Sequence, residues 1–104
     1  MRIQINTGGN IEGGEGLEQH TQAVVATTLD HLGEHITRVE VHLSDENGPK
    51  AGSVDKRCLM EARLEGQQPI AVTHEAQSLH EAIAGAADKL KRSLEHTLSR
   101  FNER

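Results

Sequence analysis

The sequence predicts an α+β fold in which a four-stranded mixed sheet carries two helices on one face, in the order β-α-β-β-β-α. Apolar and polar residues alternate over residues 37–44 and 56–65, a pattern typical of strands with one buried face. Apolar residues recur at helical spacing over residues 17–32 and from residue 78 to about residue 101. With 104 residues the chain has the size of one domain, so we expect residues 1–104 to share one core.

The first half of the chain predicts a strand, a glycine-rich loop and a helix. The strand covers residues 2–6, and five of the ten residues in the loop at 7–16 are glycine. Gly33 is expected to end the helix at residues 17–32. The next strand, at residues 37–44, is predicted to run parallel to the first after a right-handed crossover. The apolar side of this helix, continued by Ile36 after its end, comprises Leu17, Thr21, Val25, Leu29, Leu32 and Ile36.

The remaining strands are predicted to form an antiparallel meander. A connection rich in turn formers, residues 45–55 with Asn47-Gly48-Pro49 at its centre, leads to the strand at residues 56–65. Cys58 falls in the inward register of that strand and is expected to be a small core residue. A turn at residues 66–69 then reverses the chain into a fourth strand.

The last helix has the clearest start signal. Ser78 and Glu81 have the spacing of a capping box, in which each residue satisfies an amide of the other. Gly85 lies inside this helix, where it either permits close packing or weakens the helix. The expected apolar stripe comprises Leu79, Ile83, Ala86, Leu90, Leu94, Thr97 and Phe101.

Composition excludes several classes of protein. Eleven Lys and Arg against sixteen Asp and Glu give a net charge of -5, which argues against a strongly basic nucleic-acid binder. Phe101 is the single phenylalanine, and the chain has no Tyr or Trp, so a base-stacking surface is not expected. The single cysteine excludes an internal disulfide. No apolar run reaches membrane-spanning length and no signal peptide is visible, so we expect a cytoplasmic protein without membrane partners.

Charge is nevertheless uneven along the chain. Residues 88–104 carry five basic and three acidic side chains, a local balance of +2. At 100° per residue, one stripe of the last helix contains Lys89, Arg92, His96 and Arg100. Such a stripe suits a phosphate backbone. The alternative is a solvated flank with an ordinary four-residue ion pair between Asp88 and Arg92.

Basic residues also occur on the predicted strands. Arg38 and Arg63 are expected to pair across strands with Glu40 and Glu61. Lys56 and Arg57 start the strand at residues 56–65, beside a loop, and are better placed to contact phosphate. Lys91 is a further candidate in the last helix. The candidate RNA contacts are therefore Lys56, Arg57, Lys89, Lys91, Arg92, His96 and Arg100.

Metal and catalytic chemistry are not favoured. His31 and His35 have the four-residue spacing of helical metal ligands, and Asp30 and Glu34 are nearby. However, Gly33 is expected to end the helix between the two histidines, and no Cys or fourth ligand is evident. Exposed surface histidines are the simpler interpretation, and no cofactor is expected. No set of nucleophile and base, and no pair of carboxylates, stands out, so a small hydrolase or transferase ranks lowest and we expect no enzyme.

Two segments resemble a known family. Thr7-Gly8-Gly9-Asn10-Ile11-Glu12 follows a short strand, and residues 75–83 and 86–94 carry Ala-Ile, Asp-Lys-Leu and a basic residue before Leu94. This pattern resembles the ribosome hibernation-promoting factors, also called ribosome-associated translation inhibitors or sigma-factor modulation proteins. The element order of that family matches the fold predicted here along nearly the whole chain.

The resemblance implies a small cytoplasmic stress protein that is not an enzyme. It implies binding to ribosomal RNA and proteins in the decoding channel of the small ribosomal subunit, where the protein excludes messenger and transfer RNA and stores idle ribosomes. The chain resembles the short form of the family, which lacks a dimerising carboxyl-terminal domain.

One difference from the family pattern motivates a second hypothesis. Family members carry basic residues on the first helix, whereas no Lys or Arg lies between Arg2 and Arg38 in this chain. RNA phosphate repels an acidic helix. The alternative is therefore a protein-interaction module of the same shape without ribosome affinity, and a weak homodimer through the open sheet face or an edge strand stays open. The acidic residues in question are Glu12, Glu15, Glu18, Asp30 and Glu34.

Overall fold

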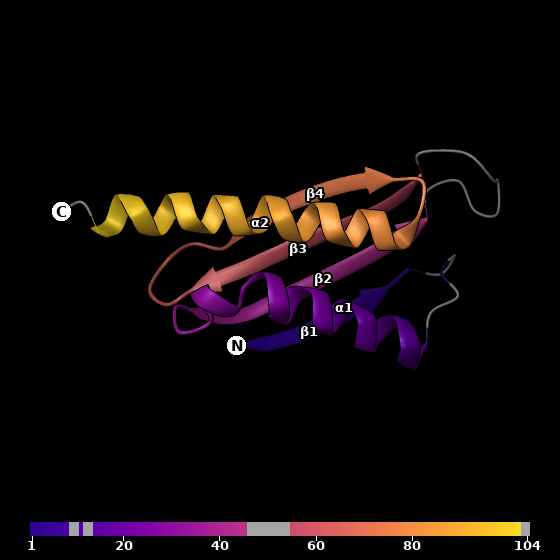
Figure 1. Ribbon diagram of the computed structural model, residues 1–104, viewed down its shortest axis with the longest axis horizontal. Coiled ribbons are helices and arrows are strands. Elements are labelled where there is room, and N and C mark those ends of the chain that lie inside the picture. Colours follow the sequence, from indigo (N-terminus) through magenta and orange to yellow (C-terminus); the bar gives the residue numbers. More distant parts are fainter. Residues whose placement is uncertain (9–10, 12–13, 46–54, 103–104) are drawn as a thin grey trace.

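The computed structural model describes residues 1–8, 11, 14–45 and 55–102, the side chains of the last two excepted. Figure 1 shows the predicted order of elements. The chain forms β1 (Arg2–Thr7), α1 (Glu15–Thr28), a 3₁₀ turn η1 (Asp30–Leu32), β2 (Ile36–Asp45), β3 (Lys56–Leu64), β4 (Ile70–Ala76) and α2 (Leu79–Asn102). The predicted turn at Asn47-Gly48-Pro49 and the side chain of Phe101 lie outside the described residues.

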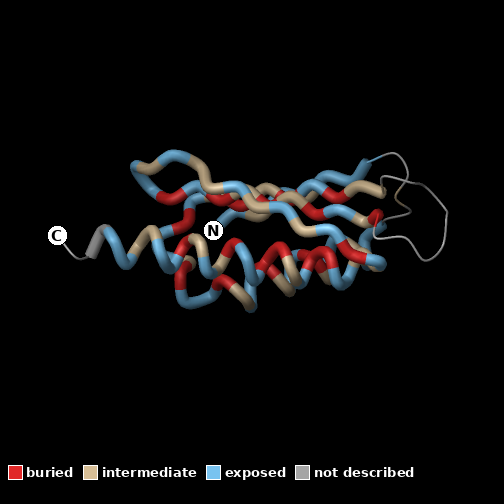
Figure 2. Tube along the Cα trace, turned by 90° about the horizontal axis from the view of Figure 1, so that it is seen from above, coloured by how far each residue is buried: buried red, intermediate tan, exposed pale blue. Residues whose placement is uncertain are grey.

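The four strands form one mixed sheet in the order β1-β2-β3-β4. β1 runs parallel to β2, and the β2–β3 and β3–β4 pairs are antiparallel. Both helices lie on the same side of the sheet (Figure 2), with α2 packed on β3 and β4 and α1 beside α2. The predicted fold class and strand directions are therefore confirmed. No helix of the described residues lies on the opposite face of the sheet, which is named here the open face.

The core lies between the sheet and the helices. Alternate residues of β2 and β3 point into it, and Cys58, as predicted, is fully buried among them. Burial raises the pKa of the Cys58 thiol to about 12, so the thiol stays neutral and unreactive. Four residues of the predicted stripe in α2 are buried: Ile83, Ala86, Leu90 and Leu94. Leu79 and Thr97 are only half-buried, and Ala82 and Ala87, which the prediction did not include, are buried as well.

The end of the first helix differs from the prediction. α1 ends at Thr28, and the next residues form the 3₁₀ turn η1, in which the Leu32 N–H donates to the Leu29 carbonyl at 2.9 Å. In a 3₁₀ turn side chains three residues apart align, so Leu29 and Leu32 both reach the core. Gly33 follows the 3₁₀ turn η1 in a right-handed conformation, so the α-helix itself ends five residues before Gly33. The positive φ among the described residues occurs instead at Gly66, in the turn after β3.

Of the two hydrogen bonds of the predicted capping box, the one from the Glu81 amide to the Ser78 side chain is present at the start of α2. The Glu81 N–H donates to Ser78 Oγ at 3.1 Å, which satisfies one of the free amides of the first turn. Further along α2, Gly85 lies against the ring of His74 from β4. A Cβ atom added at Gly85 would stand 2.2 Å from His74 Cδ2 and 2.6 Å from its Cγ. Close packing is therefore the reason for glycine at this position.

Candidate nucleic-acid interface

Four predicted contact residues, Lys89, Arg92, His96 and Arg100, share one flank of α2 and are named here the basic stripe. All four are exposed. Lys89 Nζ donates to the main-chain carbonyl of Thr73 at 2.9 Å, which places the stripe along the β4 edge of the sheet. A neutral carbonyl leaves the ammonium charge uncompensated, so Lys89 keeps its attraction for an anion.

One ion pair lies within the basic stripe. Arg92 Nη2 is 2.6 Å from Asp88 Oδ2, the four-residue pair that the sequence offered as the alternative interpretation. The two side chains are 69% and 53% exposed, and such surface pairs contribute little free energy. A phosphate group can therefore replace Asp88 as the partner of Arg92. Within the described part of the chain, His96 and Arg100 form no ion pair.

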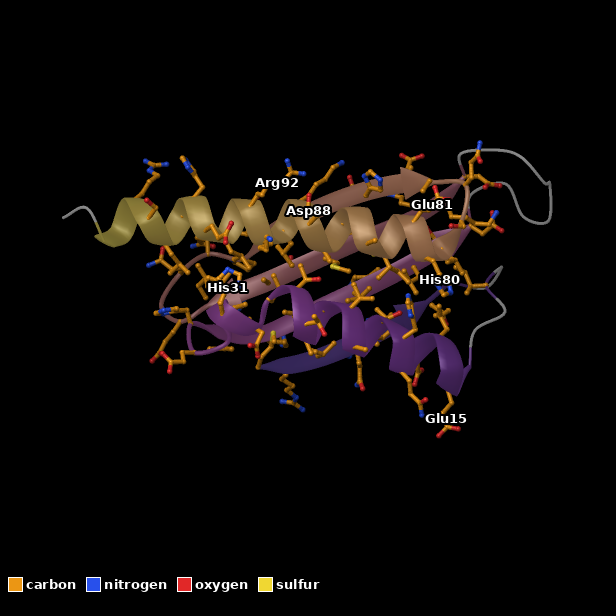
Figure 3. The ribbon with its side chains drawn as sticks, viewed as in Figure 1. Glu15, His31, His80, Glu81, Asp88 and Arg92 are labelled. Atoms are coloured by element: carbon orange, nitrogen blue, oxygen red, sulfur yellow. The ribbon has the colours of Figure 1, made fainter. Side chains whose placement is uncertain are left out.

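The opposite flank of α2 faces α1. The rings of His20 and His80 stack there with centroids 4.1 Å apart, and His31 Nε2 lies 2.8 Å from Glu95 Oε2. Figure 3 shows His31 and His80 on this side and Arg92 on the other. Lys91 is eleven residues after His80, about 20° from it around the helix, and so belongs to the α1 flank. The basic stripe thus points away from the acidic first helix.

Lys56 lies far from the basic stripe, at the end of the sheet where β4 leads into α2. Its ammonium is 2.9 Å from Asp55 Oδ1 and 3.3 Å from Asp45 Oδ2. The hydrogen bond from Lys56 holds the pKa of Asp55 below its usual value, and the same bond raises the pKa of Lys56. Because two carboxylates surround one ammonium, this cluster, named here the Lys56 cluster, attracts anions weakly.

Arg57 is next to Lys56 in the strand, so the two side chains point to opposite faces of the sheet. Arg57 is exposed on the open face, where the register places it between Ser44 and Glu75. The seven predicted contacts therefore divide among three places: the basic stripe, the α1 flank and the β3 start. The structure brings only the first group together.

The strand register differs from the predicted cross-strand ion pairs. Arg38 stands opposite Arg63 and Glu40 stands opposite Glu61, so like charges face each other across β2 and β3. In the parallel pair, Arg2 stands opposite Arg38. The open face thus carries a row of Arg2, Arg38 and Arg63, named here the arginine row, which the sequence pattern did not indicate. Alternation places these residues on one face, but the register depends on the long connection between β2 and β3.

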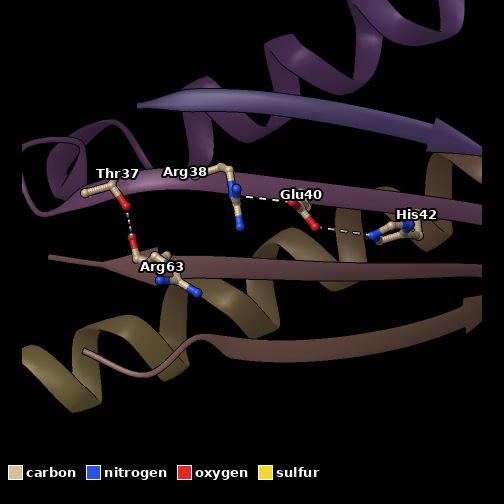
Figure 4. A network of polar contacts seen from close by, with 5 residues as sticks. All are labelled: Thr37, Arg38, Glu40, His42 and Arg63. Atoms are coloured by element: carbon tan, nitrogen blue, oxygen red, sulfur yellow. Dashed lines mark hydrogen bonds and ion pairs between the residues drawn. The ribbon is translucent and has the colours of Figure 1, made fainter. Parts of the chain in front are cut away.

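The arginine row borders a small polar network (Figure 4). Arg38 Nε lies 3.3 Å from Glu40 Oε1 along the same strand, and His42 Nε2 lies 3.7 Å from Glu40 Oε2. The Thr37 hydroxyl donates to the main-chain carbonyl of Arg63 at 3.1 Å, next to the bulge where the register of β2 shifts. Among the residues that the structure describes, Arg38 therefore forms an ion pair with Glu40 alone, and His42 lies beside the same carboxylate.

The two remaining expectations concern metals and membranes. His31 lies in η1 beside Glu95 and is not joined with His35 in a ligand set. Within the described residues, no three His, Cys, Asp or Glu side chains are placed to hold a metal ion. None of the described helices is both long enough and apolar enough to cross a bilayer.

The fold and the basic stripe together define an α+β protein with basic side chains along one exposed flank of its last helix. Residues 4–102 match the family described as sigma 54 modulation protein / S30EA ribosomal protein, and the chain belongs to this family. That description names no enzymatic activity. Among curated proteins, none matches the sequence.

Solved structures share the fold. The amino-terminal domain of Protein Y from Thermus thermophilus superimposes with a TM-score of 0.75 at 24% identity, over 93% of this chain and 99% of that domain. A ribosomal subunit interface protein from Coxiella burnetii superimposes with a TM-score of 0.73 at 16% identity, over 95% of this chain and 99% of that protein. At these identities the comparison establishes the architecture alone.

Proposed function

We propose that this protein binds the small ribosomal subunit in the cytoplasm, occupies its decoding channel and inhibits translation under stress by occlusion. Binding needs no cofactor and no chemical step. The observation that carries the proposal is the basic stripe, which lies on the flank of α2 away from α1 in a chain that belongs to the S30EA family. One of the similar structures is a ribosomal subunit interface protein, which supports the same partner.

The physical basis is exchange of counterions at RNA phosphates. Each phosphate that a stripe residue neutralises releases counterions, so the affinity falls as salt rises. A net charge of -5 opposes nonspecific binding, and binding must therefore come from the local geometry of the cations. Because α1 lies on the other side of α2, its carboxylates are kept from the RNA that the stripe contacts.

Co-sedimentation with purified small subunits over a range of salt concentrations tests this proposal. We expect the variant Arg92→Gln/Arg100→Gln to lower the slope of log affinity against log salt by about 2, one for each phosphate that the variant no longer neutralises. The control variant Gln19→Glu/Gln22→Glu changes the net charge equally on exposed positions of α1 and should keep the slope. No pelleting of the wild-type protein at low salt would contradict the proposal and favour the protein-interaction module.

Occupation of the decoding channel makes a second prediction. Saturating protein should release bound transfer RNA from small subunits, because both need the same space. Filter binding with labelled transfer RNA measures this release, and Arg92→Gln/Arg100→Gln should require a higher protein concentration for the same effect. Transfer RNA that stays bound while the protein pellets would place the protein elsewhere on the subunit.

A further inference from the structure

The arginine row is an unusual arrangement in a protein of this composition. Directly opposed like charges destabilise a sheet, yet Arg2, Arg38 and Arg63 stand side by side on three adjacent strands. Within the described residues, Arg2 and Arg63 form no ion pair, and Arg38 has only the shared carboxylate of Glu40. The row therefore concentrates positive charge that the protein itself leaves largely unbalanced.

The same residues border a recess in the surface. Arg2, Thr37, Arg38 and Arg63 line an open hollow of about 440 Å³. Strand register places the three arginines on the sheet face away from the described helices. Guanidinium groups present their N–H donors in a planar fork that matches two oxygens of a phosphate or a carboxylate. A shallow hollow with several such forks accommodates an extended anion that lies across the surface.

We propose that the arginine row binds the phosphodiester backbone of an RNA strand lying across the open sheet face. The chain has no Tyr or Trp, and its one Phe is in α2, so this face offers no such ring on which a base could stack. The contacts that we propose are those of guanidinium forks with phosphate oxygens, which carry no sequence information. Three strands place the row over about 10 Å, since neighbouring strands are about 4.8 Å apart.

The position of the row allows one folded RNA to reach both cationic surfaces. The row crosses the sheet where β1 and β2 begin and β3 ends. Figure 1 shows the carboxyl-terminal turns of α2, which carry Arg100, at this same end of the molecule. That the RNA is ribosomal rests on the proposed function, whereas the phosphate contact itself rests on the arginine row.

Amide NMR spectra during titration with a single-stranded oligoribonucleotide of mixed sequence test the contact directly. We expect shift changes at Thr37, Arg38 and Arg63, and a slope of log affinity against log salt that is smaller by about 1.4 for Arg38→Gln/Arg63→Gln. Both side chains lie on the open face, so the variant should keep its fold, which circular dichroism checks. The control Gln19→Glu/Gln22→Glu, with the same change in net charge, should keep the wild-type slope.

Each outcome decides the proposal. Unchanged affinity of Arg38→Gln/Arg63→Gln, or shift changes restricted to α2, would overturn it. Polyglutamate that gives the same shifts at the same salt would assign the row to an acidic protein surface and also overturn it. Failure of the wild-type protein to pellet with small subunits, together with oligonucleotide binding through the row, would reject the proposed function and support the phosphate contact.

Discussion

Replacing Gly85 by alanine is expected to destabilise the protein, although alanine is the better helix former. The added methyl would meet the ring of His74 at 2.2 Å, and because Cγ is also within 2.6 Å the whole ring must move. Overpacking of this kind typically lowers the free energy of unfolding by roughly 1–3 kcal/mol. Alanine recovers up to about 1 kcal/mol of helix propensity. Urea denaturation should therefore show a net loss of up to about 2 kcal/mol.

A double-mutant cycle separates the clash from helix propensity. In a His74→Ala background the ring is absent, so Gly85→Ala should raise the free energy of unfolding by about 1 kcal/mol. Ala84→Gly is the matched control on the exposed side of the same turn, and it should lower stability by a similar amount. If Gly85→Ala stabilises the wild-type background, the ring of His74 does not hold the position that we describe.

Replacing Asp55 by asparagine is expected to lower stability most strongly near neutral pH. The folded-state pKa of Asp55 lies below its usual value of 3.8, so this carboxylate stabilises the fold above pH 3.8 and loses its effect as the pH falls through the lowered pKa. The pKa of Lys56 lies above 10.5, so the ammonium contributes below that pH and loses its effect as the pH rises through the raised pKa. The Lys56 cluster therefore stabilises the protein fully between these limits.

Thermal unfolding of Asp55→Asn and wild type from pH 3 to pH 9 measures this contribution. The midpoint of the variant should be well below wild type at pH 7, and the difference should shrink as the pH falls below 3.8. Asp88→Asn is the matched control, because it removes a carboxylate from a surface pair and should change stability by less than about 1 kcal/mol. Equal midpoints of Asp55→Asn and wild type at pH 7 would show that Asp45 alone stabilises Lys56.

The candidate site was predictable in part. Helical spacing alone placed Lys89, Arg92, His96 and Arg100 on one flank, because residues three and four apart on a helix always share a face. The same spacing could not tell whether that flank faced α1, the sheet or solvent. The bond from Lys89 to Thr73 and the pair of His31 with Glu95 give its direction.

The strand residues show where local pattern stops being informative. Lys56 and Arg57 are adjacent in sequence, yet strand alternation sends them to opposite faces, and Lys56 meets two carboxylates from either side of a long connection. Arg38 and Arg63 have glutamates nearby in sequence, yet the register opposes arginine to arginine.

By itself, the sequence determined the class of fold, the order and direction of the strands and the amphipathic course of α2. These follow from periodicity and short connections, which are local properties of the chain. Only the tertiary structure decided which charges meet, because strand register and the packing of α2 between β4 and α1 depend on contacts between distant segments. The arginine row, the Lys56 cluster and the fit of Gly85 against His74 all arise from such contacts.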